Sequence, residues 1–185
     1  MFRKLSVILV IGLLAFTAAC SSKSSSSTNA VSATGVAAGA AASSTPAACP
    51  TKNTESFAKT KFVADVAIAG GAFKRYIYTP AKDGKFKKGA NGRVLAFVKA
   101  AAAGALTVNR LEAAKTAAQA NPTLCKLLAE PIAKFSAAVS GLISKAKGGS
   151  INPSDVDNAG GYLSNLHGAA SQGGAAFTDN TNATA

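Results

Sequence analysis

The chain contains no tryptophan, one histidine and only eight acidic residues among its 185. No segment alternates polar and β-branched residues with the two-residue period of a half-buried strand, which argues against a β-sheet domain. The acidic residues are scattered and form neither an acid/base pair nor a metal-binding cluster. His167 has no Asp or Glu spaced to orient it, and no nearby serine lies in a nucleophile-elbow pattern. We therefore expect no enzymatic activity, no metal and no cofactor.

The first 20 residues have the pattern of an export signal. Arg3 and Lys4 precede an apolar run from Leu5 to Phe16. This run of about a dozen residues is shorter than the roughly 20 that span a bilayer. Small residues then lead to Cys20, and a run of serines follows it. The pattern resembles a bacterial lipoprotein signal, in which the signal peptide is removed and the cysteine receives acyl chains such as palmitate.

This resemblance implies a signal peptide over residues 1–19, lipidation of Cys20, and a protein anchored at the outward face of the cell membrane. Thr17 stands where the lipoprotein pattern has an aliphatic residue. An ordinary secretory signal and a freely secreted protein are therefore the alternative. Residues 20–48 are almost all small and polar, and we expect a flexible tether with a root-mean-square length of about 30 Å. We expect no membrane-spanning segment after it.

Two cysteines remain for the rest of the chain, Cys49 and Cys125. An exported protein is in an oxidising compartment, where two cysteines usually pair, although two separate thiols are the alternative. In the chain-entropy model, a disulfide that closes a loop of about 75 residues contributes about 4 kcal/mol. We therefore predict a Cys49–Cys125 disulfide within a single domain over residues 49–172, followed by a disordered tail over 173–185.

Four segments of this domain carry apolar residues at alternating steps of three and four, the period of a helix face. Asn53 or Thr54 is expected to cap the first helix, and Pro80 with Asp83-Gly84 to end it. Phe73 to Thr79 is the nearest approach to a strand, and we interpret it as the end of that helix. The first predicted face comprises Phe62, Val66, Ala69, Phe73 and Ile77, and the second comprises Val94, Phe97, Val98, Ala101, Ala105 and Val108.

The third and fourth segments begin with Asn121-Pro122 and Asn152-Pro153, each a capping residue before a proline at the first helical position. Pro131 is expected to kink or split the third helix. The third predicted face comprises Leu124, Leu128, Phe135, Val139 and Leu142, and the fourth comprises Val156, Ala159, Leu163, Leu166 and Ala170.

These elements predict an all-α fold, a small four-helix up-and-down bundle. In that topology the first and third helices begin at the same end. Cys49 precedes the first helix and Cys125 lies in the first turn of the third, so the predicted disulfide is consistent with the bundle.

Basic residues are concentrated between Lys52 and Lys99, where 11 basic side chains accompany three acidic ones. Aromatic residues are interspersed among them, as in proteins that bind single-stranded nucleic acid. An exported protein meets anionic lipid headgroups and wall polymers more often, so we expect no nucleic-acid partner. The first interpretation is a solvated loop that joins the first and second helices and keeps the protein soluble, and a contact with such an envelope anion is the alternative. The candidate contact residues for an anionic surface are Lys74, Arg75, Lys82, Lys85, Lys87, Lys88 and Arg93.

Four strings of the mature part carry a family resemblance: Cys49-Pro50-Thr51, the segment 56–62, the segment 73–78, and Asn121 to Cys125. They resemble exported helical proteins and lipoproteins of unassigned function from high-GC Gram-positive bacteria. This resemblance implies no activity. The sequence thus favours a non-catalytic envelope lipoprotein that serves as a binding or interaction module. A carrier with an apolar ligand between helices splayed around Pro131 is the alternative.

Overall fold

The computed structural model describes residues 48–182, which belong to one unit of the chain. The predicted signal peptide over 1–19, Cys20 and the predicted tether up to residue 47 lie outside the described residues. The described part is helical and has no strand, which confirms the predicted all-α class. Its elements are α1 (Ala58–Phe73), η1 (Lys74–Tyr78), α2 (Thr79–Lys82), α3 (Arg93–Gln119), α4 (Pro122–Lys147) and α5 (Pro153–Gln172).

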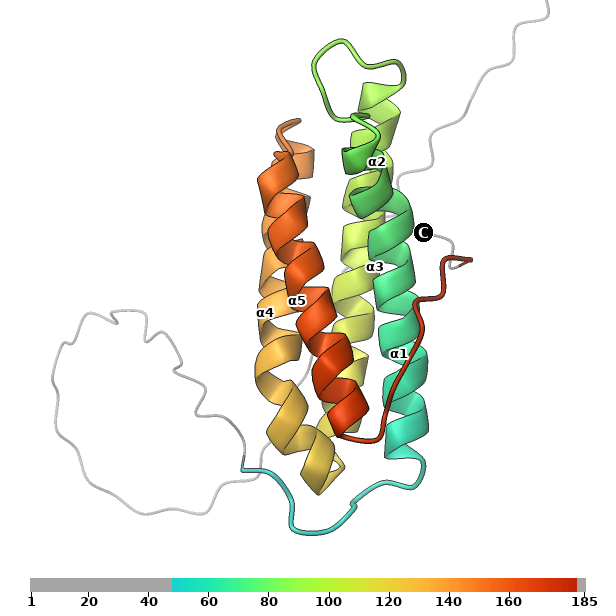
Figure 1. The fold of residues 1–185 in the computed structure, drawn as a ribbon, viewed down its shortest axis with the longest axis vertical. Coiled ribbons are helices and arrows are strands. Elements are labelled where there is room, and N and C mark those ends of the chain that lie inside the picture. The colour runs from blue at the N-terminus through green and yellow to red at the C-terminus, as the bar shows by residue number, and fades with distance from the viewer. Residues whose placement is uncertain (1–47, 183–185) are drawn as a thin grey trace, which may run out of the picture. The chain divides into compact units, whose positions relative to one another are not determined.

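The long helices pack as neighbours in a simple order (Figure 1). α3 packs against both α1 and α4, and α5 packs against α4. Only Ala120 and Asn121 separate α3 from α4. The Asn121 side chain accepts hydrogen bonds from the Thr123 and Leu124 amides, both at 3.0 Å. Asn121 therefore caps α4, as the Asn-Pro signal predicts.

The start of α1 differs from the prediction. Phe57 precedes the helix with a φ of 61°, and no side chain caps the helix there. Asn53 instead accepts a hydrogen bond from the Asn121 side chain at 2.8 Å, and the Thr54 amide donates to the Ala120 carbonyl at 3.0 Å. Both residues thus attach the incoming chain to the α3–α4 turn, where the predicted Cys49–Cys125 disulfide is present.

Two prolines lie within helical stretches, so Pro80 does not end the first predicted helix and Pro131 does not split the third, while the kink at Pro131 stays a prediction. Pro80 lies in the first turn of α2, which continues directly from η1, so the helical path runs on to Lys82 and ends before Gly84. The π-helical turn η1 confirms that residues 74–78 are helical. Pro131 lies inside α4 without ending or splitting it. Ile132 and Phe135 beside it are buried in the core, and their burial offsets the cost of the backbone hydrogen bond that proline cannot donate.

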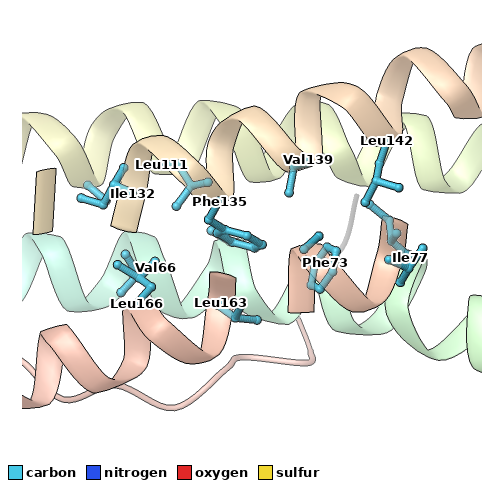
Figure 2. Packing of buried hydrophobic residues seen from close by; sticks show 14 of the residues in the cluster. Val66, Phe73, Ile77, Leu111, Ile132, Phe135, Val139, Leu142, Leu163 and Leu166 are labelled. Atoms are coloured by element: carbon cyan, nitrogen blue, oxygen red, sulfur yellow. The ribbon is translucent and has the colours of Figure 1, made fainter. Parts of the chain in front are cut away.

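The core confirms three of the four predicted faces, since every residue of the first, third and fourth is buried. Figure 2 shows side chains from these helices pointing toward one another, and the Phe73 ring meets the Phe135 ring edge-on at 5.3 Å between centroids. The second face is wrong for Val94 and Val98, which are 77% and 60% exposed, and for Ala105, which is also exposed. α3 instead turns small residues inward together with two larger ones: Phe97, Ala100, Ala103, Gly104, Thr107, Leu111 and Ala114.

The prediction of a disordered tail is wrong for residues 173–182, which we call the C-terminal strap; residues 183–185 lie outside the described part. The strap runs along α1 (Figure 1), and the Asn180 amide donates to the Ala67 carbonyl at 2.8 Å. A Cβ atom on Gly70 would collide with Asp179, and one on Gly71 with the Asn180 backbone. The Gly70-Gly71 pair therefore makes room for the strap.

By length and composition alone, α3 and α4 are apolar enough to cross a membrane, contrary to our expectation. Two such helices are weak evidence for a membrane span, because a mostly buried core helix of a soluble protein meets the same criterion; 33% and 28% of the apolar stretches of α3 and α4 are buried. One face of each helix packs on neighbouring helices of the domain. Exposed charged residues, such as Lys115 of α3 and Glu130 of α4, lie outside these buried faces.

Candidate functional site

The candidate site is the basic segment that runs from η1 through α2 into the start of α3. Residues 83–92 form the loop between α2 and α3. Figure 1 places this loop at the opposite end of the long helices from residue 48, where the described chain begins. The cations of this loop therefore lie at the end of the described domain far from residue 48.

Three of the seven predicted cations hold other parts of the domain in place. Lys74 forms an ion pair with Asp179 of the strap, with 2.5 Å between Nζ and Oδ2. Arg75 donates to the Thr181 carbonyl at 3.0 Å. Lys82 pairs with Asp157 of α5, with 2.5 Å between Nζ and Oδ1. The hydrogen bond to Asp157 raises the pKa of Lys82 above its ordinary value of 10.5, which is consistent with a cation already occupied by a carboxylate.

Arg93 has a structural role at the start of α3. Its Nε donates to the Phe86 carbonyl at 3.0 Å, and its Nη2 donates to the Gly149 carbonyl at 2.6 Å. The guanidinium also lies 4.7 Å from the centroid of the Phe97 ring, which packs 5.0 Å from Phe86. Arg93 thus ties the α2–α3 loop to the α4–α5 connection, and its donors are used within the fold.

Lys85, Lys87 and Lys88 differ from these four residues. All three are exposed, and within residues 48–182 no carboxylate lies within 4.0 Å of their ammonium groups. We call them the loop lysines. They have no ion-pair partner in the described part of the chain, so among the seven predicted cations they are the ones free to meet an external anion.

Lys99 extends this group, although it was not among the predicted contact residues. Lys85, Leu95 and Lys99 share the lining of a shallow, open hollow of about 230 Å³, together with Tyr76 and Pro80. Lys99 is exposed on the second turn of α3 and has no ion-pair partner among the described residues. Lys99 lies beside the outward-facing Leu95 and Val98. The helical period would therefore have identified it if the inward face of α3 had been predicted correctly.

His167 has an acidic partner, contrary to the prediction. Its Nε2 lies 3.1 Å from Asp179 Oδ1 and 3.2 Å from Oδ2, and Phe177 stacks on its ring at 3.9 Å between centroids. Ser164, one turn earlier, donates its hydroxyl to the Gly160 carbonyl at 3.2 Å. The hydrogen bonds thus join His167 to the strap and Ser164 to its own helix, an arrangement that favours a structural role for both.

Other features of the described residues offer little for chemistry. A hollow of about 350 Å³ between η1 and α5 is open to solvent, and Lys74, Asp157 and His167 on its lining are already paired within the fold. No group of three or more His, Cys, Asp or Glu side chains is placed to hold a metal ion in residues 48–182. No family model, curated protein or solved structure matches the chain. The site is therefore interpreted from its own geometry.

Proposed function

We propose that the chain is an exported, non-catalytic lipoprotein of the cell envelope. Acyl chains on Cys20 would hold it at the outward face of the membrane, and residues 21–48 would link that anchor to the helical domain. The support for the anchor is the residue pattern around Cys20. The support for export is the same pattern together with the Cys49–Cys125 disulfide, which is typical of oxidising compartments.

The scaffold of this proposal is the predicted up-and-down four-helix bundle. The two-residue turn between α3 and α4 and the five-residue connection between α4 and α5 favour antiparallel neighbours. The packing of α3 on α1 and α4, and of α5 on α4, agrees with that order. A rigid scaffold of this kind presents the α2–α3 loop at one end of the domain.

The observation that carries the functional proposal is the set of loop lysines without partners. We propose that Lys85, Lys87 and Lys88 contact phosphate-bearing groups of the envelope, either lipid headgroups or an anionic wall polymer. Each lysine near an anionic membrane surface contributes about 1 kcal/mol of attraction. Salt weakens such contacts, because the Debye length is only about 8 Å at physiological ionic strength.

The test uses a chain beginning at Ser21, which carries neither the signal peptide nor acyl groups. The triple variant Lys85→Gln/Lys87→Gln/Lys88→Gln is compared with Lys52→Gln/Lys59→Gln/Lys126→Gln, which removes the same charge at the disulfide end. Sedimentation with phosphatidylglycerol vesicles and with isolated wall polymer is measured at low and raised salt. We expect the first variant to lose binding to one of these materials and the control to keep most of it. Equal losses of binding in both variants would show that binding depends on net charge alone and would contradict a contact through the loop lysines.

No observation favours the two alternatives. A carrier would need room between helices splayed at Pro131, but α4 is continuous there and Ile132 and Phe135 beside it are buried. A freely secreted protein would share every described feature and differ only at Cys20, so the mass of the native chain separates that alternative from the proposed lipoprotein.

A further inference from the structure

The beginning of α3 presents an apolar face to solvent. Val94, Leu95 and Val98 are 77%, 57% and 60% exposed, and they are three of the four large apolar side chains exposed in the described part of the chain. A helix advances about 100° per residue, so these three residues share a sector that Ala102 and Ala105, also exposed, continue along the axis. We call the five residues the α3 outer face.

Cations border this face. Lys99 projects from the same turns of α3, and Lys85 lines one hollow with Leu95 and Lys99. Lys87 and Lys88 lie in the loop that leads directly into α3. An apolar helix face flanked by lysines is the pattern of a surface that lies in the headgroup region of an anionic bilayer, with the apolar side chains at the acyl boundary.

We infer that the α3 outer face docks on an anionic lipid bilayer, with Val94, Leu95 and Val98 entering the interface and Lys85, Lys87, Lys88 and Lys99 contacting lipid phosphates. This inference rests on the proposed function and identifies the anionic partner as the membrane itself. A wall polymer would satisfy the lysines but would leave the apolar side chains in water. A second copy of the chain would bring an identical set of lysines to the interface, in a protein whose formal net charge is +12.

The location of the face is compatible with attachment through Cys20. The start of α3 lies at the end of the domain opposite residue 48 (Figure 1), and the face runs along the helix axis, so docking places α3 along the membrane. α3 is 27 residues long, which corresponds to about 40 Å. The 28 residues between Cys20 and Cys49 extend to about 95 Å when fully stretched, which is ample for this orientation.

The test uses the full chain in vesicles that contain a membrane-soluble diazirine. Photolysis labels side chains that enter the lipid phase. Trypsin cleaves after Arg93 and Lys99, so the peptide 94–99 reports the α3 outer face. The peptide 135–145 of α4 lies between Lys134 and Lys145 and is a matched apolar control. Vesicles of phosphatidylcholine alone are compared with vesicles that also contain phosphatidylglycerol.

We expect the peptide 94–99 to take up several-fold more label than 135–145 in the anionic vesicles, and the excess to disappear in raised salt or in the variant Leu95→Ser/Val98→Ser. Equal labelling of the two peptides, or labelling that does not depend on phosphatidylglycerol, would overturn the inference. A labelling of 94–99 that falls as the protein concentration rises would also overturn it, since that result identifies a second copy of the chain as the molecule that covers the face. The intact mass of the same sample reports acylation of Cys20 separately, so failure of the anchor and failure of the docking face are distinguishable.

Discussion

At the scale of single residues, the strap depends on two glycines that have no side chain to obstruct it. Gly70 and Gly71 face Asp179 and Asn180, and the strap is held there by the Asn180–Ala67 hydrogen bond and the Lys74–Asp179 ion pair. Alanine is a better helix former than glycine by about 1 kcal/mol. At these positions, steric conflict with the strap opposes that gain.

Gly71→Ala is therefore expected to release the strap. The added Cβ collides with the Asn180 backbone, which cannot rotate away as a flexible side chain could. Limited proteolysis should show faster cleavage within residues 173–182, and the Asn180 amide should exchange faster. Gly141→Ala is the control, because a Cβ there meets nothing within 4 Å and should stabilise the domain by up to about 1 kcal/mol. Unchanged cleavage in Gly71→Ala would contradict this role of the glycine pair.

A second residue-scale prediction concerns acid. The ion pair with Lys145, 2.6 Å between Nζ and Oδ2, lowers the pKa of Asp155 below its ordinary value of 3.8. Asp155 also lies in the first turn of α5, where the helix dipole favours a negative charge. Its stabilising contribution is complete above pH 3.8 and is lost as the pH falls through the lower folded-state pKa.

The Asp155→Asn variant lacks that titration. Because the carboxylate is 28% exposed and Lys145 is 42% exposed, we expect a difference of about 0.5 kcal/mol near neutral pH. Thermal melts of both proteins should therefore converge as the pH is lowered below 3.8. A gap that stays constant down to the most acid condition would assign the difference to lost packing instead of lost charge.

At the scale of elements, Pro131 is the main local defect of α4. Proline in a helix interior removes one backbone hydrogen bond and costs about 3 kcal/mol in model helices. Pro131→Ala should therefore raise the free energy of unfolding by about 1–3 kcal/mol, as measured by urea titration. Ala133→Pro at a neighbouring exposed position of α4 should lower it. A neutral or destabilising Pro131→Ala would show that the core has adapted to the proline.

The elements also show what could be predicted from the sequence. Large residues spaced along α1, α4 and α5 identified their buried faces, because burial of Phe and Leu dominates packing energy. The same reasoning was wrong for α3, because its inward face is mostly Ala, Gly and Thr, while Val94 and Val98 on the outer face are more apolar. The strap was missed because its one large apolar residue, Phe177, gives no periodic signal.

The candidate site could also be predicted only in part from the sequence. The basic segment was recognised from its composition, since its cations are close in the sequence. The carboxylates that occupy Lys74 and Lys82 come from Asp179 and Asp157, which lie far along the chain. Only the fold separates these paired cations from the loop lysines.

At the scale of the whole molecule, the disulfide joins the incoming chain to the turn that connects α3 with α4. It closes a loop with a sequence separation of 76, and the chain-entropy model assigns it about 4 kcal/mol. The double variant Cys49→Ser/Cys125→Ser should lower the free energy of unfolding by up to this amount while keeping its helical circular dichroism. An unchanged urea midpoint would show that the Asn53–Asn121 and Thr54–Ala120 hydrogen bonds suffice to hold this end.

The central claim is that this domain is held at the membrane by lipid on Cys20. The most direct measurement is the intact mass of the chain isolated from the membranes of the cells that make it, with and without reductant. We expect a chain that begins at Cys20, carries two or three acyl groups, and gains two hydrogens on reduction of the Cys49–Cys125 bond. An unacylated chain recovered from the medium would contradict it and make this a secreted protein.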